Sequence, residues 1–189
     1  MGADRRIIKT KKAIKQAFTR LLLEHRSMSN ISVTKLVEAA DISRGTFYLH
    51  YADMYELLAD VEADLIIEFE TAVNTHEATE LKDSLLPLIR EIISFIEANS
   101  DILSILVTDR LDLNFTLRLK EITRQKCFEN WERNFGTKPN KAHEYYYSFI
   151  FAGSVDLIIE WFQGEIDETA DSMAQIIERI IVEGANVLD

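Results

Sequence analysis

Hydrophobic residues recur every three to four positions along most of the chain, which is the spacing of one buried helix face. In the first such stretch, near residues 5 to 26, Ile14, Phe18, Leu21 and Leu22 share a face, and lysines mostly occupy the others. The pattern predicts an amphipathic helix that ends at the polar stretch HRSMSN.

Two short helices are predicted next, and each follows a serine whose hydroxyl can accept hydrogen bonds from the first turn. Ser32 precedes an apolar stripe that ends near Asp41, and Ser43 precedes a helix from Arg44 to about Tyr51. Two short helices joined by a three-residue turn and braced by longer helices are typical of a helix-turn-helix. We therefore place such a motif at about residues 32–51.

The rest of the chain also predicts helices. Asp53 can cap a long helix that runs through Phe69, and Pro87 fits the first turn of another. Three later helices are expected at about residues 115–135, 143–162 and 168–187. With six Gly and two Pro in 189 residues, we expect an all-α protein: a three-helix DNA-binding domain over 1–52 and a larger helical domain for ligand binding and dimerisation over 53–189.

Charge is distributed unevenly along the chain, whose net charge is −11. Residues 1–52 hold ten Lys and Arg against four Asp and Glu, a net charge of +6, which leaves −17 for the remainder. A cationic head can bind phosphates while an anionic body stays away from the duplex. No apolar run approaches the roughly 18 residues of a membrane span, so we expect a cytoplasmic protein with no membrane partner.

The second short helix carries side chains suited to a DNA groove. Phe47 and Tyr51 lie four residues apart and can face inward. Arg44 is then free for guanine edges or phosphate, Thr46 for base edges, and Tyr48 and His50 for phosphates. The predicted DNA-binding residues are Ser32, Thr34, Lys35, Ser43, Arg44, Gly45, Thr46, Tyr48 and His50.

The stretch ISVTKLVEAADISRGTFYLHYADMYELL resembles the DNA-binding segment of tetracycline-repressor-like (TetR/AcrR) transcriptional regulators, and the resemblance spans about residues 5 to 65. Asp41 stands where the family usually has Gly at a left-handed position. Met54 stands where many members have a lysine that meets phosphate. We therefore expect the affinity for DNA to depend on other basic side chains, namely Lys9, Lys11 and Lys12.

The resemblance implies a homodimeric repressor that binds double-stranded operator DNA and is released when an effector binds the second domain. It also implies a palindromic operator and a small hydrophobic or aromatic effector. Aromatic residues that could line such a site are Phe95, Phe115, Phe128, Trp131, Tyr146 and Phe149. Core packing is the competing interpretation for each of them, and the alternative function is a coregulator whose second domain docks a protein partner.

The last predicted helix has an apolar stripe too wide for a helix that covers a single surface. One side is therefore expected to meet a second subunit, together with the helix near 143–162. The predicted dimer residues are Gly153, Leu157, Trp161, Met173, Ile177, Ile180 and Gly184, where the two glycines would let helices approach closely.

Catalytic chemistry has no recognisable motif in this sequence. The four histidines lack metal-binding spacing, and neither a Gly-rich phosphate loop nor a GxSxG motif occurs. Cys127 is the single cysteine, and we interpret it as a small buried hydrophobe. We therefore predict no enzyme activity, no catalytic or metal-binding residues and no cofactor.

Overall fold

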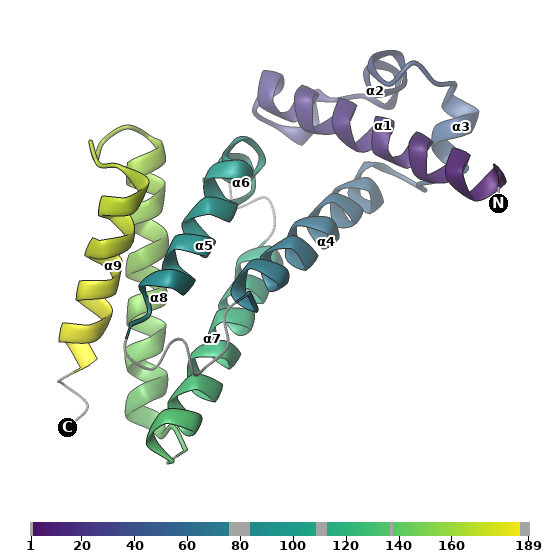
Figure 1. Cartoon of the computed structure of the whole chain (residues 1–189). Helices are drawn as coiled ribbons and strands as arrows, with labels where there is room; N and C mark the ends of the chain where they lie inside the picture. Colours follow the sequence, from purple (N-terminus) through teal and green to yellow (C-terminus); the bar gives the residue numbers. More distant parts are fainter. Residues whose placement is uncertain (1, 76–83, 109–112, 137, 186–189) are drawn as a thin grey trace. The chain divides into compact units, whose positions relative to one another are not determined.

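Every regular element of the described residues is helical in the computed structural model (Figure 1), which confirms the expected all-α class. The structure describes residues 2–75, 84–108, 113–136 and 138–185. The chain divides into two compact units. Unit 1 comprises residues 1–65 and 101–111, and unit 2 comprises residues 66–100 and 112–189. The DNA-binding domain predicted at 1–52 thus lies within unit 1, which also includes residues 53–65 and 101–111.

Unit 1 contains the three predicted N-terminal helices, a short 3₁₀ turn, the first part of a long helix and one further helix. These are α1 (Gly2–His25), η1 (Met28–Asn30), α2 (Val33–Ala39), α3 (Arg44–Tyr48), the start of α4 (Met54–Val73), and α6 (Ser100–Thr108). The inward face of α1 is the predicted one, with Ile14, Phe18 and Leu22 fully buried. Leu36 of α2 and Phe47 of α3 are also fully buried, so all three helices contribute to the interior.

Side-chain caps begin the helices of the motif as the sequence predicts. The Ser32 hydroxyl accepts a hydrogen bond from the Lys35 amide at 3.2 Å, and the Ser43 hydroxyl accepts one from the Thr46 amide at 3.0 Å. Asp53 likewise accepts two amide hydrogen bonds in the first turn of α4. These caps fix the start of each helix by satisfying donors that have no partner within the helix.

The turn between α2 and α3 has the left-handed backbone expected at Asp41, whose φ is +54°. Asp tolerates this conformation better than most residues that carry a Cβ. The turn of this motif therefore forms without glycine.

Unit 2 is built from the end of α4 and four further helices, namely α5 (Leu86–Ala98), α7 (Leu113–Phe135), α8 (Lys141–Phe162) and α9 (Ala170–Gly184). Helices α5 and α9 lie side by side (Figure 1). Their shared interior consists of Ile89, Ile93, Met173, Ala174 and Ile177, which are at most 6% exposed. Partly buried residues of α8, including Ile158 and Trp161, pack against it.

This core corrects two dimer assignments. Met173 and Ile177 are 1% and 5% exposed within their own subunit, so they cannot form a surface for a second copy. The stripe of α9 is wide because α5 covers one side of it and α8 packs nearby. Sequence periodicity shows that the stripe is wide but not which neighbour covers each part.

Helix α6 was not predicted as a separate element. Helix α5 ends at Ala98 with Asn99 as its C-cap, and α6 begins at the next residue, Ser100. No Gly or Pro separates the two helices, so Asn99 and Ser100 are the local signals that mark this boundary.

Candidate DNA interface

The two faces of α3 divide as the sequence predicts. Phe47 and Tyr51 are 0% and 2% exposed, whereas Tyr48 is 54% exposed. Arg44 and Gly45 are also exposed at the N-terminal end of the helix. An arginine and a tyrosine on the open side of a short capped helix can contact phosphates and base edges.

The remaining predicted DNA-binding residues lie at the starts of α2 and α3, on α3 or in the turn that follows it, and several also have structural roles. Thr34 and Lys35 are exposed at the start of α2. The Ser43 hydroxyl caps α3 and also lies 2.9 Å from the Thr46 hydroxyl. Thr46 and His50 are partly exposed. Because Ser32 and Ser43 both cap helices, a change at either one alters helix geometry as well as any DNA contact.

Leu49 is a candidate that we did not predict. It follows α3 directly and is 84% exposed, the most exposed large apolar side chain of the described residues. A leucine in this place can contact the methyl group of thymine. The signal was present in the sequence, because Leu49 lies two positions after the inward-facing Phe47 and therefore falls on the opposite side of the helix.

The lysines of α1 differ in what surrounds them. Lys9 and Lys12 are exposed. Lys11, in contrast, donates to the Asp60 carboxylate of α4 at 3.1 Å. The expectation that Lys11 is available for phosphate is therefore corrected, because a nearby acid already binds its ammonium group.

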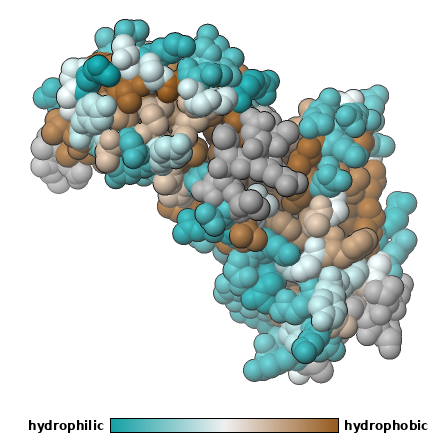
Figure 2. Space-filling model, turned by 180° about the vertical axis from the view of Figure 1, so that it is seen from behind, coloured by the Kyte–Doolittle hydropathy of each residue, from teal (hydrophilic) through white to brown (hydrophobic). Residues whose placement is uncertain are grey.

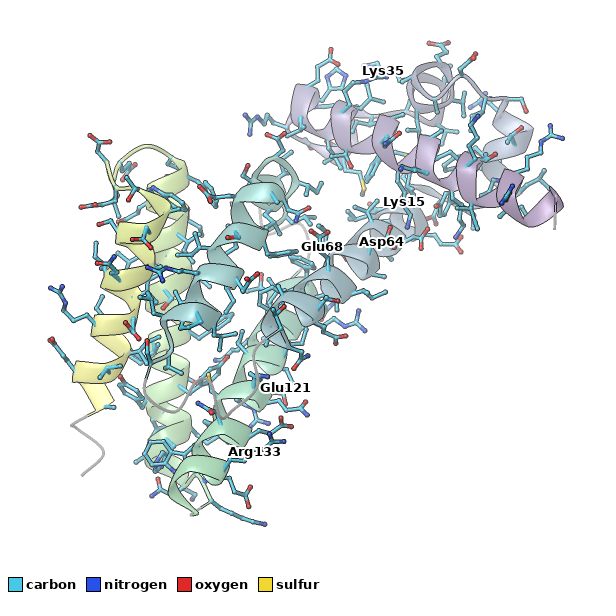
Figure 3. All side chains as sticks on the ribbon, viewed as in Figure 1. Lys15, Lys35, Asp64, Glu68, Glu121 and Arg133 are labelled. Atoms are coloured by element: carbon cyan, nitrogen blue, oxygen red, sulfur yellow. The ribbon has the colours of Figure 1, made fainter. Side chains whose placement is uncertain are left out.

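Asp60 is the centre of a polar cluster inside unit 1. Its Oδ2 atom accepts a hydrogen bond from the Tyr51 hydroxyl at 2.7 Å and ion pairs with Lys15 at 3.0 Å as well as with Lys11. Lys15 also pairs with Asp64 at 2.5 Å, and Figure 3 shows these two side chains close together. The Lys11 ammonium lies 5.1 Å from the centre of the Tyr51 ring.

The ionisation of Tyr51 and Asp60 reflects this cluster. Burial and then the hydrogen bond to Asp60 raise the pKa of Tyr51 far above its usual value, so its hydroxyl remains a donor. Burial alone would raise the pKa of Asp60, but the hydrogen bonds from Tyr51, Lys15 and Lys11 outweigh it and lower the pKa. Asp60 is therefore an ionised acceptor at neutral pH.

The six aromatic residues expected to line an effector site have different surroundings within unit 2. Phe95 is buried and packs on Phe69 with ring centres 5.2 Å apart, and Phe115 is 1% exposed. Phe149 is 76% exposed on α8, so its assignment to an interior cavity is corrected. Its outward orientation follows from α8 having one open face.

Phe128 and Trp131 are partly buried, and both contact α8 from α7. The Phe128 ring lies 5.8 Å from that of Tyr147, and the Trp131 ring lies 4.4 Å from that of His143. Cys127 is also partly buried on α7, and burial raises the pKa of its thiol to about 11. The thiol is therefore protonated at neutral pH.

Tyr146 and Gly184 contact each other across α8 and α9 of one subunit. The Tyr146 hydroxyl donates to the Ile181 carbonyl, and a Cβ added at Gly184 would lie 2.8 Å from that hydroxyl oxygen. The close approach that we assigned to a dimer contact at Gly184 therefore occurs within the subunit. Gly153, in contrast, has open space around its missing Cβ.

Apolar and small residues form one exposed face of α8, which we call the α8 face. It consists of Ala142, Tyr145, Phe149, Ala152 and Gly153, and the exposed Asp156 lies on the same side of the helix. Ile180, which is 45% exposed, extends the apolar surface onto α9. In Figure 2, hydrophobic residues follow the side of unit 2 where α8 and α9 lie.

The other two predicted dimer residues are less open. Leu157 is partly buried, and so is Trp161, which also packs against the core shared by α5 and α9. The indole nitrogen of Trp161 donates to the Glu168 carbonyl at 2.7 Å, which ties this side chain to its own subunit.

Among the described residues, no helix has the length and apolarity needed to cross a bilayer. The same residues contain no group of three or more His, Cys, Asp or Glu side chains that could hold a metal ion.

Comparison with known protein families gives two matches, which fall on different parts of the chain. Residues 18–61 match the model described as bacterial regulatory proteins, tetR family. Residues 83–183, more than half of the chain, match a transcriptional regulator C-terminal region of the same family. The first match includes α2 and α3 with their caps, and the second includes the α5, α8 and α9 core.

Individual relatives agree with this assignment. An uncharacterised HTH-type transcriptional regulator, YxbF of Bacillus subtilis (strain 168), is 38% identical over 55 residues, which are 29% of this chain and 14% of that protein. A TetR transcriptional regulator from Streptococcus agalactiae 2603V has a TM-score of 0.70 at 24% identity and covers 96% of this chain and 98% of its own. LfrR from Mycobacterium smegmatis, solved in complex with proflavine, has a TM-score of 0.56 at 14% identity and covers 93% of this chain and 96% of its own. These structural likenesses show the fold.

Proposed function

Because the chain belongs to the tetR family of bacterial regulatory proteins and is therefore a DNA-binding transcriptional regulator, we propose that α3 enters the major groove of an operator. The observation that carries this proposal is the division of α3 and the turn after it, with Phe47 and Tyr51 buried and Arg44, Tyr48 and Leu49 exposed. Arg44 and Leu49 would contact bases, and Tyr48 would contact phosphate.

The test uses DNA from upstream of the gene that encodes this protein. Footprinting identifies the protected sequence, and fluorescence anisotropy then measures its affinity beside that of an unrelated duplex. Tyr48→Ala should weaken binding to both duplexes because a phosphate contact carries little sequence information. Leu49→Ala should weaken operator binding alone. If both variants are folded and bind the operator like the original protein, α3 is not the DNA-contacting helix.

We also infer that the regulator is a homodimer assembled through the α8 face and Ile180. Exposed large apolar side chains that gather on one helix face are typical of protein interfaces. Tyr145 and Phe149 are 73% and 76% exposed in the single subunit, and Gly153 leaves room for a neighbouring helix. A two-fold dimer would present two α3 helices to half-sites one turn of DNA apart, which favours a palindromic operator.

We propose that the protein acts as a repressor and that a small hydrophobic or aromatic effector binds unit 2 and releases the operator. Phe128 and Trp131, which contact α8 from α7, are partly exposed aromatic candidates within unit 2, as is Tyr146 of α8. LfrR, a protein of the same fold, was solved in complex with proflavine. Release requires that the effector bind more tightly to the form with low DNA affinity.

Trp131 provides a direct assay for the effector. The chain has two tryptophans, so Trp161→Phe leaves Trp131 as the single indole fluorophore. Aromatic compounds that change its fluorescence should also lower operator affinity. A reporter gene under the operator tests the direction of regulation, since deletion of a repressor raises expression. If a protein in cell extract dissociates the regulator from the operator and small molecules do not, the second domain docks a protein partner and the effector proposal is wrong.

A further inference from the structure

One carboxylate oxygen in unit 1 receives donors from three segments of the chain. Asp60 Oδ2 on α4 accepts a hydrogen bond from Tyr51, in the turn that ends α3, at 2.7 Å. The same oxygen lies 3.0 Å from the Lys15 ammonium and 3.1 Å from the Lys11 ammonium, both on α1. Asp60 therefore connects α1, α3 and α4 through a single atom.

The connection extends from Asp60 to the exposed surface of α3 through packed aromatic rings. The Tyr51 ring is 2% exposed and lies 5.9 Å from the ring of Phe47, which is fully buried. Phe47 in turn meets the ring of the exposed Tyr48 at 5.3 Å in an edge-to-face arrangement. A shift of the Tyr51 hydroxyl would therefore be passed through two tightly packed contacts to a side chain that faces DNA.

The Tyr51 hydroxyl is a polar group at an otherwise apolar, buried position, where phenylalanine would fill nearly the same volume without it. That hydroxyl finds its acceptor in Asp60, and two lysines neutralise the charge of the carboxylate. One hydroxyl and two ammonium donors offset the cost of removing the carboxylate from water. The loss of one donor leaves part of that cost without compensation.

We propose that Asp60 is a positioning residue for operator recognition. It holds α3 against α1 and α4 in the pose that aims Arg44 and Tyr48 at DNA, and it keeps Lys11 and Lys15 away from phosphate. The proposal rests on the proposed role of α3 in DNA contact. An ordinary stabilising ion pair would affect the free energy of unfolding but not the ratio of operator to unrelated-DNA affinity, so that ratio distinguishes the two roles.

The first variant is Tyr51→Phe, which removes one oxygen and no charge. We expect operator affinity to fall by up to about tenfold, a bound set by the scale of one hydrogen bond to a charged group. Affinity for an unrelated duplex should fall less, because it lacks the base contacts that depend on the pose of α3. Measurements are made well below the thermal midpoint of each variant, so that unfolding does not contribute. An unchanged affinity ratio would overturn the positioning role of Asp60.

Two charge variants test whether Asp60 keeps the lysines from DNA. Asp60→Asn can still accept from Tyr51 but no longer holds two cations, so affinity for the unrelated duplex should rise. The salt slope should steepen by up to about 1.8, or roughly 0.9 for each lysine released. Lys11→Met should leave the slope unchanged. A slope that falls by about 0.9 in Lys11→Met would show that Lys11 contacts phosphate and would overturn this half of the proposal.

Two further variants serve as controls. Lys12→Met changes an exposed lysine of α1 beside Lys11 and should affect both duplexes together, so the affinity ratio remains constant. Tyr48→Ala tests α3 itself. If Tyr48→Ala weakens binding and Tyr51→Phe leaves the ratio unchanged, the positioning proposal fails while α3 remains the DNA-contacting helix. If Tyr48→Ala has no effect, the assignment of α3 fails instead.

Discussion

Replacement of Phe149 by alanine should dissociate the dimer without unfolding the subunit. A buried aromatic side chain covers about 150–250 Å², and 76% of Phe149 is exposed in the single subunit. Roughly 100–200 Å² of its surface is therefore available to a partner. At about 25 cal/mol per Å², burying that area contributes about 3–5 kcal/mol for each copy, which is an upper bound because association also restricts motion.

Alanine retains part of this area, so about 2 kcal/mol per subunit is a realistic loss. In the proposed two-fold dimer Phe149 would lie in the interface twice, and the total of about 4 kcal/mol corresponds to a roughly thousandfold weaker dimer. The subunit itself should change little, since substitutions of exposed side chains usually stay within about 0.5 kcal/mol.

Sedimentation equilibrium over a dilution series measures the dissociation constant, and circular dichroism checks that the variant keeps its helices. Leu117→Ala is the matched control, because Leu117 is 57% exposed but lies on α7. If Phe149→Ala dimerises as tightly as the Leu117→Ala control, the α8 face does not form the interface.

Three further outcomes test the corrected assignments. Ile177→Glu should unfold the subunit, because it buries a charge in the α5 and α9 core. Ile180→Glu should instead give a folded monomer. Thermal melts detect the unfolding, and sedimentation detects the monomer. Gly184→Ala should destabilise the subunit by about 1 kcal/mol in urea unfolding, and the cost should largely disappear in a Tyr146→Phe background, where the oxygen that meets the new methyl is absent. Since folding raises the pKa of Tyr51, its contribution is present below its unfolded pKa of about 10 and is lost as pH rises above that value. Tyr51→Phe should therefore lose less stability than the original protein between about pH 10 and pH 11, and an identical loss would contradict the burial of this phenol.

Local chemistry explains why the DNA-binding motif was predictable. The caps at Ser32, Ser43 and Asp53 bond to amides two or three residues away, and Asp41 adopts its left-handed backbone inside one turn. Interactions of this range depend on sequence neighbours alone. The starts of α2, α3 and α4 therefore follow from the order of residues around each cap.

Long-range pairings explain what was not predictable. Lys11 and Asp60 are 49 positions apart, and Tyr146 and Ile181 are 35 apart. Periodicity identifies the apolar face of α9 but does not show that α5 covers it. Met173 was consequently assigned to a dimer surface, although it lies in the core of its own subunit.

The same long-range pairing changes how the charge of the head should be understood. The +6 of residues 1–52 excludes Asp53 and the first turns of α4, which together add five acids and no base by residue 65, so residues 1–65 carry a net charge of only +1. Two of the ten cations are paired with Asp60 or Asp64, which leaves at most eight for phosphate. Attraction to DNA must then come from the placement of these cations on α1, α2 and α3 rather than from the net charge of unit 1. The salt slope of operator binding should therefore be no steeper than about −7 per head, at roughly −0.9 for each phosphate neutralised.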